Sequence, residues 1–420
     1  MSVWKLLSGH HVFRRYLTAL LIWDLTKWIL AAVIPLFLND RYGIGKEFVS
    51  GMVMELLPGI VLGPIVGVWI DRWGAKRMTT LDVLSYSLLI AILPFTQQLW
   101  HVQFALLAIG ISQTIGSPAS LTLRASVIPK GEEIQGNSLV LGIDRLSKIV
   151  GPLLGSLMII ILDYTKVMLI CSVMGLLSFV LFSMVHVPER RKTQNSTHQG
   201  TGFNREMLRL LFKDRLILGL VITALGYSLT LGILKLYLLT TAGSYGNVEL
   251  YWGLLLAAQG LGALVGAIGC HTVISRCRNR FSITAIYMVF GLGEAVLLAG
   301  LSLPFGLVWS LFILIVAAIF EIMATIIYFS ILQSRIDLGM QGRFNSITLP
   351  MQDASYMAGF SLFGLLNGAM AANGLLWFGL SIILLCHLPF MAAFFKHKED
   401  AGGGLPEPNS NSGGSRQAES

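Results

Sequence analysis

Residues 67–77 read Gly-Val-Trp-Ile-Asp-Arg-Trp-Gly-Ala-Lys-Arg and lie between two apolar runs, each long enough to cross a bilayer. We expect one helix to end near Ile70, the chain to reverse at Gly74, and the next helix to begin near Met78. Gly67 removes a side chain where two helices must approach closely. A turn this short cannot be a domain, so the chain around it is predicted to be a series of membrane helices.

The composition excludes a soluble globular protein. Of the 420 residues, 55% are hydrophobic and only 12% are charged, and the mean hydropathy is +0.72. We count about twelve apolar runs of roughly twenty residues, each the length of one bilayer-spanning helix. The predicted fold class is therefore an all-α membrane protein with twelve transmembrane helices in two six-helix bundles.

Six helices are expected on each side of a polar segment. In the first half they cover about 14–38, 47–70, 78–97, 102–127, 137–161 and 165–187, and in the second half about 214–241, 248–272, 281–301, 305–333, 344–370 and 373–396. The predicted domains are an N-terminal bundle (1–187), a polar linker without apolar periodicity (188–212), a C-terminal bundle (213–396) and a disordered tail (397–420).

The net charge of +8 is explained by topology. Lys and Arg gather at the N-terminus, in the turn at 67–77, in the linker, near residue 278 and in the tail, whereas the alternate loops carry only Arg41, Lys46 and Lys166. By the positive-inside rule, both termini and the linker are cytoplasmic. We therefore expect a multi-pass protein of the plasma (inner) membrane that contacts anionic lipid and does not bind nucleic acid.

The turn at 67–77 resembles the loop between helices two and three of the major facilitator superfamily, whose pattern is G-x-x-x-D-R-x-G-R-[RK]. Ala75 departs from the first Arg of the pattern, and Lys76 and Arg77 restore the charge. In that family the loop latches the cytoplasmic side. The resemblance therefore implies gate residues, which are Gly67, Asp71, Arg72, Gly74 and Arg77.

The fifth predicted helix ends in Gly151-Pro152-Leu-Leu-Gly155, which resembles the antiporter motif of exporters in the superfamily. Glycines allow close helix contact and the proline allows a bend. A second pattern, Gly-Ser-Pro-Ala at 116–119 followed by Gly-Asn-Ser-Leu at 136–139, looks like the macrolide-efflux-like branch. The resemblance implies a drug:proton antiporter-like transporter that uses the proton gradient and no cofactor.

An ionisable residue inside a membrane helix costs about 2.5 kcal/mol or more at mid-bilayer, so it usually faces a cavity or a partner. Those we singled out from the sequence are Asp24, Lys27, Glu55, Arg124, Asp144, Arg145, Lys148, Lys235, Glu321 and Asp353. Among them, the candidates for proton coupling are Glu321, Asp24, Glu55 and Asp144. The candidates for ion pairing or substrate contact are Lys27, Lys235, Arg145 and Asp353, together with Gln352.

Asp24 and Lys27 are three residues apart on one helix face and can pair. A carboxylate held beside a cation stays ionised, and burial favours its protonated form once the cation moves away. The same two residues could instead form a permanent structural pair. Glu55 lies about a third of the way into its helix, where an outward cavity could wet it.

Glu321 has no helical neighbour to neutralise it. It must be protonated or meet Lys235 or another cation across the bundle. In proton-coupled exporters that the chain resembles, an acid in this region of the tenth helix often serves as the proton site.

We therefore expect a monomeric secondary transporter that exports a small amphipathic compound, such as a drug, an antibiotic or a secreted metal-chelating metabolite, in exchange for protons. The alternatives are a proton-coupled nutrient importer, a lipid or lysolipid flippase, and a non-transporting receptor or scaffold. An enzyme is not expected, because no nucleophile constellation or nucleotide loop is present in the sequence. Cys171, Cys270, Cys277 and Cys386 lack C-x-x-C spacing, so no metal site is expected.

Overall fold

Twelve long helices build the part of the chain that the structure, a computed structural model, describes, which is residues 10–129, 131–185, 214–278, 280–336 and 338–400. The N-terminal bundle consists of α2 (His11–Tyr42), α3 (Lys46–Trp73), α4 (Ala75–Ile92), α5 (Leu99–Val127), α6 (Glu133–Ile161) and α7 (Tyr164–Ser183). The C-terminal bundle consists of α9 (Arg215–Ser244), α10 (Val248–Arg278), α11 (Ile283–Ala299), α12 (Leu307–Arg335), α13 (Leu338–Leu366) and α14 (Ala372–Asp400).

Short 3-10 turns, η1 (Leu93–Phe95) and η2 (Gly300–Ser302), follow α4 and α11. Nine of the described helices are long and apolar enough to cross a membrane. The other three, α3, α6 and α13, lie at the junction of the bundles, where α3 packs against α13 and α6 packs against α10. The predicted all-α fold with two six-helix bundles is confirmed.

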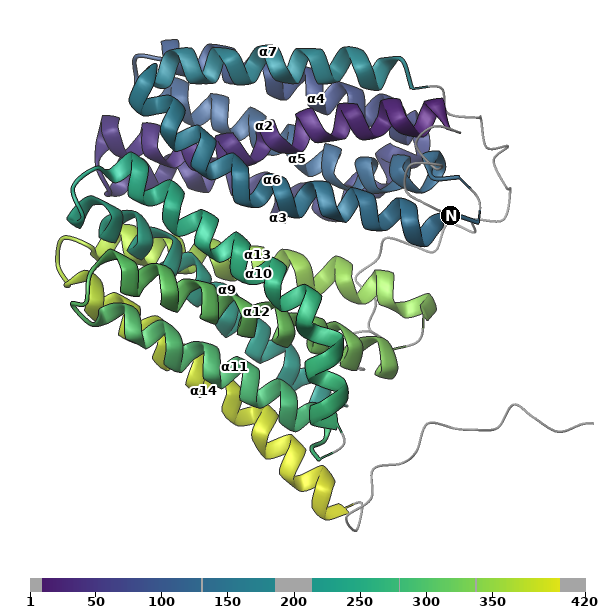
Figure 1. The fold of residues 1–420 in the computed structure, drawn as a ribbon, viewed down its shortest axis with the longest axis vertical. Coiled ribbons are helices and arrows are strands. Elements are labelled where there is room, and N and C mark those ends of the chain that lie inside the picture. The colour runs from purple at the N-terminus through teal and green to yellow at the C-terminus, as the bar shows by residue number, and fades with distance from the viewer. Residues whose placement is uncertain (1–9, 130, 186–213, 279, 337, 401–420) are drawn as a thin grey trace, which may run out of the picture.

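The bundles lie one above the other in Figure 1, with α2–α7 above and α9–α14 below. Their helices approach one another on the left and diverge toward the right, where the N-terminal end of α2 and the C-terminal end of α14 lie. We call the right-hand end the terminus side and the left-hand end the opposite side.

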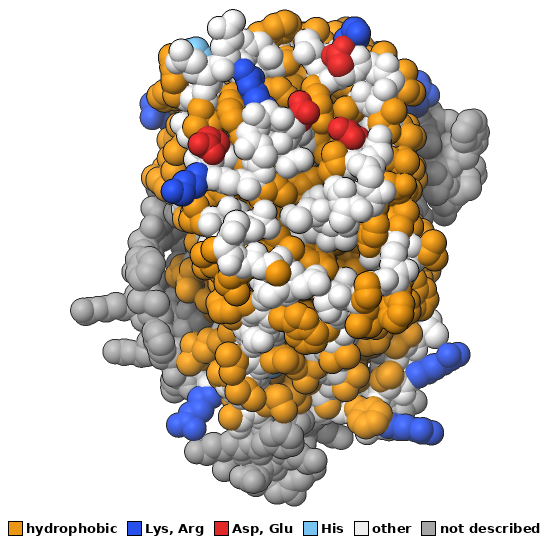
Figure 2. All heavy atoms as spheres, turned by 90° about the vertical axis from the view of Figure 1, so that its left-hand side faces the viewer, with side chains coloured by type: hydrophobic (Ala, Val, Ile, Leu, Met, Phe, Trp, Pro, Cys, Tyr) orange, Lys and Arg blue, Asp and Glu red, His pale blue; other side chains and the backbone are white. Residues whose placement is uncertain are grey.

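The bundles touch on the opposite side. The rings of Phe48 (α3) and Phe360 (α13) stack with centroids 5.9 Å apart. The indole of Trp252 (α10) donates to the carbonyl of Ala32 (α2) at 3.2 Å. Buried residues of both bundles share one hydrophobic core there, and Figure 2 shows hydrophobic side chains over much of this face.

The turn after α3 forms as the sequence predicts. Gly74 has φ 87, a left-handed conformation that favours glycine, and its N–H bonds to the carbonyl of Ile70 at 2.8 Å. Lys76 ties the start of α4 to the end of α7, since its ammonium donates to the carbonyl of Ser183 at 2.9 Å. The turn therefore anchors the N-terminal bundle within itself.

Two predictions need correction. A Cβ on Gly67 would meet no atom within 4 Å, so the expected close helix contact at this residue is wrong for this conformation. Gly67 is exposed at this point of α3. The last helix does not end near residue 396 but continues to Asp400. The predicted linker at 188–212 and the rest of the tail lie outside the described residues.

Candidate functional site

Described residues of both bundles line three cavities that bear on the site. The N-terminal cavity, of about 360 Å³, is lined by α2, α4, α5 and α6. The C-terminal cavity, of about 230 Å³, is lined by α9, α11, α12, α13 and α14. The central cavity, of about 240 Å³, is lined by helices of both bundles. Most of the ionisable residues predicted from the sequence line one of these spaces.

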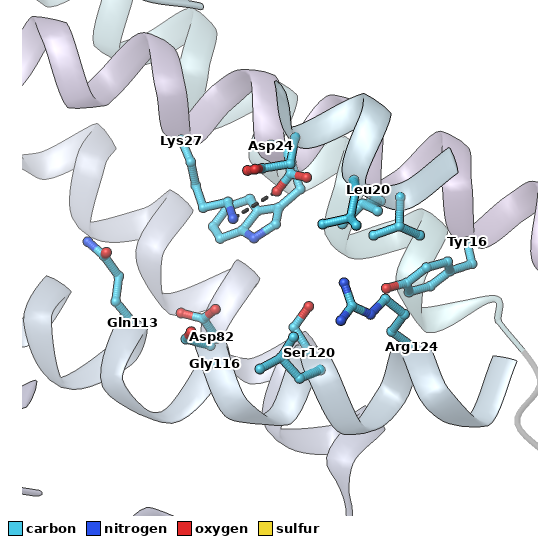
Figure 3. A pocket seen from close by; sticks show the side chains of 15 residues that line it. Tyr16, Leu20, Asp24, Lys27, Asp82, Gln113, Gly116, Ser120 and Arg124 are labelled. Carbon is cyan, nitrogen blue, oxygen red and sulfur yellow. Dashed lines mark ion pairs between the residues drawn. The ribbon is translucent and has the colours of Figure 1, made fainter. Parts of the chain in front are cut away.

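The predicted pair of Asp24 and Lys27 forms in the N-terminal cavity. The ammonium lies 2.8 Å from Oδ1 of Asp24, whose side chain is 6% exposed while that of Lys27 is 40% exposed. Figure 3 shows both groups pointing into the space between α2 and α5. The Lys27 ammonium therefore faces the cavity while it is paired with Asp24.

Asp82 on α4 enters the same cavity and was not singled out in the sequence. Ser112 on α5 donates to Oδ1 of Asp82 at 2.7 Å, and Ser85 lies 2.8 Å from the Ser112 hydroxyl. The sequence does contain a signal for this residue, because Asp82 lies shortly after the start of an apolar run. Asp82 and Asp24 thus place two buried carboxylates around one ammonium group, as Figure 3 illustrates.

Arg124 occupies the end of the N-terminal cavity nearest the terminus side. It faces the hydroxyl of Tyr16 across α2 and α5, with Ser120 beside it (Figure 3). Asp144 on α6 lines this cavity too, and accepts a hydrogen bond from the indole of Trp28 at 3.3 Å. The cavity therefore presents both signs of charge to any compound inside it.

Gly116 on α5 lies directly against the carboxylate of Asp82, and an added Cβ would overlap it. We expect Gly116→Ala to displace Asp82 and to lower the free energy of unfolding by about 1–3 kcal/mol through overpacking. Thermal unfolding of the purified protein measures this. Gly142→Ala is the matched control, because a Cβ on Gly142 meets no atom within 4 Å. Equal melting temperatures for the two variants would contradict the expectation.

A tyrosine bonds to one of two acids in the C-terminal cavity. The hydroxyl of Tyr227 (α9) donates to Oε1 of Glu294 (α11) at 3.2 Å, and Glu321 (α12) lines the same cavity. Glu294 was missed in the sequence, although it lies in an apolar run as Glu321 does.

Glu321 also lines the central cavity, together with Lys148 of α6 and Lys235 of α9. Among the described residues the ion pairs are Asp24–Lys27, Asp163–Lys166 and Asp214–Arg335, so a pair between Glu321 and Lys235, one of the expected possibilities, is not formed. The ammonium of Lys235 lies 4.8 Å from the centre of the Trp252 ring. On the other bundle, the positive charges of Lys148 and Arg145 partly offset the cost of burying Glu321.

The remaining candidate residues do not share one site. Glu55 accepts a hydrogen bond from Gln113 at 3.2 Å and is not among the described residues that line these cavities. Gln352 lines the C-terminal cavity, whereas Asp353 is exposed. Of the predicted gate residues, Arg72 and Arg77 are exposed, and the side chain of Asp71 lies outside what the structure describes. Their gating role stays a prediction.

The Gly-Pro-x-x-Gly motif packs α6 between two helices. A Cβ on Gly151 would lie 2.5 Å from Cβ of Trp28, and one on Gly155 would lie 3.0 Å from the carbonyl of Ile29, both on α2. On the other face of α6, the carbonyl of Pro152 approaches Gly253 of α10. The expected role of the glycines in close helix contact is confirmed, and the motif helps to join the two bundles.

Comparison with known proteins fits this architecture. The sequence model named Major Facilitator Superfamily matches residues 16–360. The chain belongs to this superfamily. It is therefore a multi-pass membrane protein and a secondary transporter of a small molecule, not an enzyme.

Its relatives in sequence are distant. The uncharacterized MFS-type transporter YfiS of Bacillus subtilis is 25% identical over 371 residues, which cover 86% of each chain. The multidrug resistance protein MdtG of Escherichia fergusonii is 26% identical over 56% of this chain and 59% of its own. Macrolide efflux protein A of Streptococcus pyogenes is 21% identical over 39% of this chain and 42% of its own.

Solved structures of the superfamily share the fold. The crystal structure of the nucleoside transporter NupG aligns with a TM-score of 0.73 at 12% identity, over 91% of this chain and 99% of that one. A bacterial homologue of the iron transporter ferroportin, in an inward-facing state, aligns with a TM-score of 0.65 at 16% identity, over 94% and 99%. At such identities the likeness shows the fold alone.

Proposed function

We propose that this superfamily member exports a small amphipathic compound from the cell in exchange for protons, with both termini in the cytoplasm. One observation carries the proposal. Glu321 on α12 and Lys148 on α6 line the same cavity from opposite bundles. One of the two lysines that line this cavity with Glu321 therefore lies on the half of the molecule that moves relative to it, whereas Lys235 lies on the same half.

Alternating access in transporters of this kind is a rocking of one bundle against the other around a site near the midplane. When α6 and α12 lie together, the positive charges of Lys148 and Arg145 offset part of the cost of burying the carboxylate form of Glu321. When the bundles rock and these cations move away, an uncompensated charge at mid-bilayer costs about 2.5–3.5 kcal/mol. Uptake of a proton removes that cost, and return of the cations releases the proton.

The polar groups of both bundles support the same assignment. In the C-terminal bundle, Tyr227 donates to Glu294 in the cavity that Glu321 also lines. In the N-terminal bundle, Lys27 pairs with Asp24 in the cavity that Asp82 also lines (Figure 3). Each bundle thus carries two acids that line one cavity. The names of two relatives, a multidrug resistance protein and a macrolide efflux protein, suggest the direction and the substrate class.

A flux measurement tests the proposal. The purified protein is reconstituted into vesicles that contain a pH-sensitive dye, a pH gradient is imposed, and erythromycin, ethidium and uridine are supplied in turn. We expect movement of an amphipathic compound against the direction of proton flow. Movement with the protons would indicate an importer, co-purified lipid that moves instead would indicate a flippase, and the absence of any flux would indicate a receptor or scaffold.

A further inference from the structure

His387 on α14 lies in the wall of the C-terminal cavity and has one ring nitrogen without a partner. The residue is 2% exposed. Its Nδ1 lies 2.8 Å from the carbonyl of Ile383, one turn earlier on the helix. A carbonyl only accepts, so Nδ1 carries the hydrogen, and Nε2 of the neutral ring is an acceptor. Nε2 is buried and has no hydrogen-bond partner within the described residues.

The opposing helix approaches this nitrogen closely. A Cβ on Gly291 of α11 would lie 2.7 Å from Nε2, so a larger residue does not fit there. Glu294, 3% exposed, follows one turn later on the same helix, and both residues line the cavity with His387. The ring of Tyr287 stacks on His387 with centroids 6.3 Å apart. The imidazole is therefore held in the wall of the cavity with its acceptor unpaired.

Acceptor groups share this wall with hydroxyl and amide groups. His387, Glu294 and Glu321 line the cavity together with serine, threonine, tyrosine and glutamine side chains, and the Tyr227 hydroxyl donates its hydrogen to Glu294. Buried polar groups in proteins are nearly always hydrogen-bonded, so an unpaired acceptor in a cavity calls for a donor. Aromatic rings that line the cavity, among them Tyr287 and Tyr328, favour a cationic one.

We propose that the C-terminal cavity is the subsite for the head group of the transported compound, a primary or secondary ammonium group, with His387 and Glu294 as its acceptors. An ammonium group supplies several N–H donors, which these acceptors can bind. The volume of about 230 Å³ is below the roughly 300 Å³ at which sites for whole drug-sized ligands begin. The rest of the compound extends into the central cavity past Glu321 and Leu231, which line both spaces.

This inference rests on the proposed function for its substrate, but its test needs no gradient. Full-length protein in lipid nanodiscs is titrated with tryptamine and with its neutral analogue tryptophol, which carries a hydroxyl in place of the amine. We expect tryptamine to bind at least about tenfold more tightly, since a charge-assisted hydrogen bond is lost in the alcohol. Equal affinity for the two probes, or no binding of tryptamine, would overturn the proposal.

Two variants locate the binding. Gly291→Ala places a methyl group against Nε2, and His387→Leu replaces the acceptor with an apolar side chain of similar size. Each variant should therefore weaken tryptamine binding about tenfold or more. Gly269→Ala and His271→Leu are matched controls on α10, since Cβ at Gly269 would meet only Met323 Cε at 3.9 Å and His271 is exposed. Unchanged tryptamine affinity in a folded Gly291→Ala or His387→Leu protein would contradict the assignment.

The probes also separate this subsite from other occupants. Binding of Zn²⁺ that is lost in His387→Leu, without binding of tryptamine, would assign the cavity to a metal and overturn the proposal. The comparison of tryptamine with tryptophol uses the wild-type protein, so it decides the matter even if neither variant folds. Because no pH gradient is imposed, failure here leaves the coupling role of Glu321 standing, and failure of that role leaves this subsite standing.

Discussion

We expect transport by Glu321→Gln to be independent of the pH gradient, whereas the variant should still bind its substrate. Glutamine keeps the size and the hydrogen-bonding capacity of the side chain but cannot take up or release a proton at the pH values of the experiment. It also has no charge for Lys148 and Arg145 to compensate, so the two conformations no longer differ in the protonation of residue 321. The check is flux in reconstituted vesicles, with and without an imposed gradient, for a compound that the wild-type protein moves.

Glu47→Gln is the matched control, because Glu47 is an exposed acid at the start of α3 and far from the cavities. It should retain gradient-driven flux. Binding of the same compound by Glu321→Gln is measured in parallel and separates loss of coupling from loss of the site. If Glu321→Gln responds to the gradient as the wild type does, Glu321 is not the coupling acid, and the acids around Lys27 become the next candidates.

Much of the architecture could be predicted from local sequence. Apolar runs give the helices because every backbone polar group must be satisfied within the membrane, and helix ends then differ from the structure by only a few residues. The ion pair of Asp24 with Lys27 follows from their spacing on one helix. The contacts of Gly151 and Gly155 with α2 could also be expected, because small residues mark close helix packing.

Contacts between residues on different helices could not be derived from local sequence. Nothing in the spacing of residues shows that Lys148 and Glu321 face one cavity, because they lie on different bundles. The choice of partner for Lys235 was also open, and the ammonium lies over Trp252 and not beside Glu321. Gly67 shows a further limit, since its expected close helix contact is not formed in this conformation. Sequence patterns describe all the states of a transporter together, whereas one structure holds a single state.

Trp252→Ala should open the opposite side of the protein. Trp252 is fully buried, bonds to the carbonyl of Ala32 in the other bundle and lies against the ammonium of Lys235. Removing a buried tryptophan costs about 3–5 kcal/mol. Because α10 and α2 must separate when this side opens, most of the cost falls on the closed state. A shift of this size corresponds to roughly 100-fold or more in the ratio of the two states.

A cysteine at Leu238, which lines the central cavity, reports this shift once the four native cysteines have been replaced. A membrane-impermeant maleimide added to whole cells should label it far faster in Trp252→Ala than in the parent. Trp100→Ala is the control, since that side chain is 51% exposed on α5, and it should leave labelling unchanged. Equal labelling rates in Trp252→Ala and its parent would mean that closure of the opposite side does not depend on the contact between Trp252 and Ala32. The stacked rings of Phe48 and Phe360 would then be the contact to test.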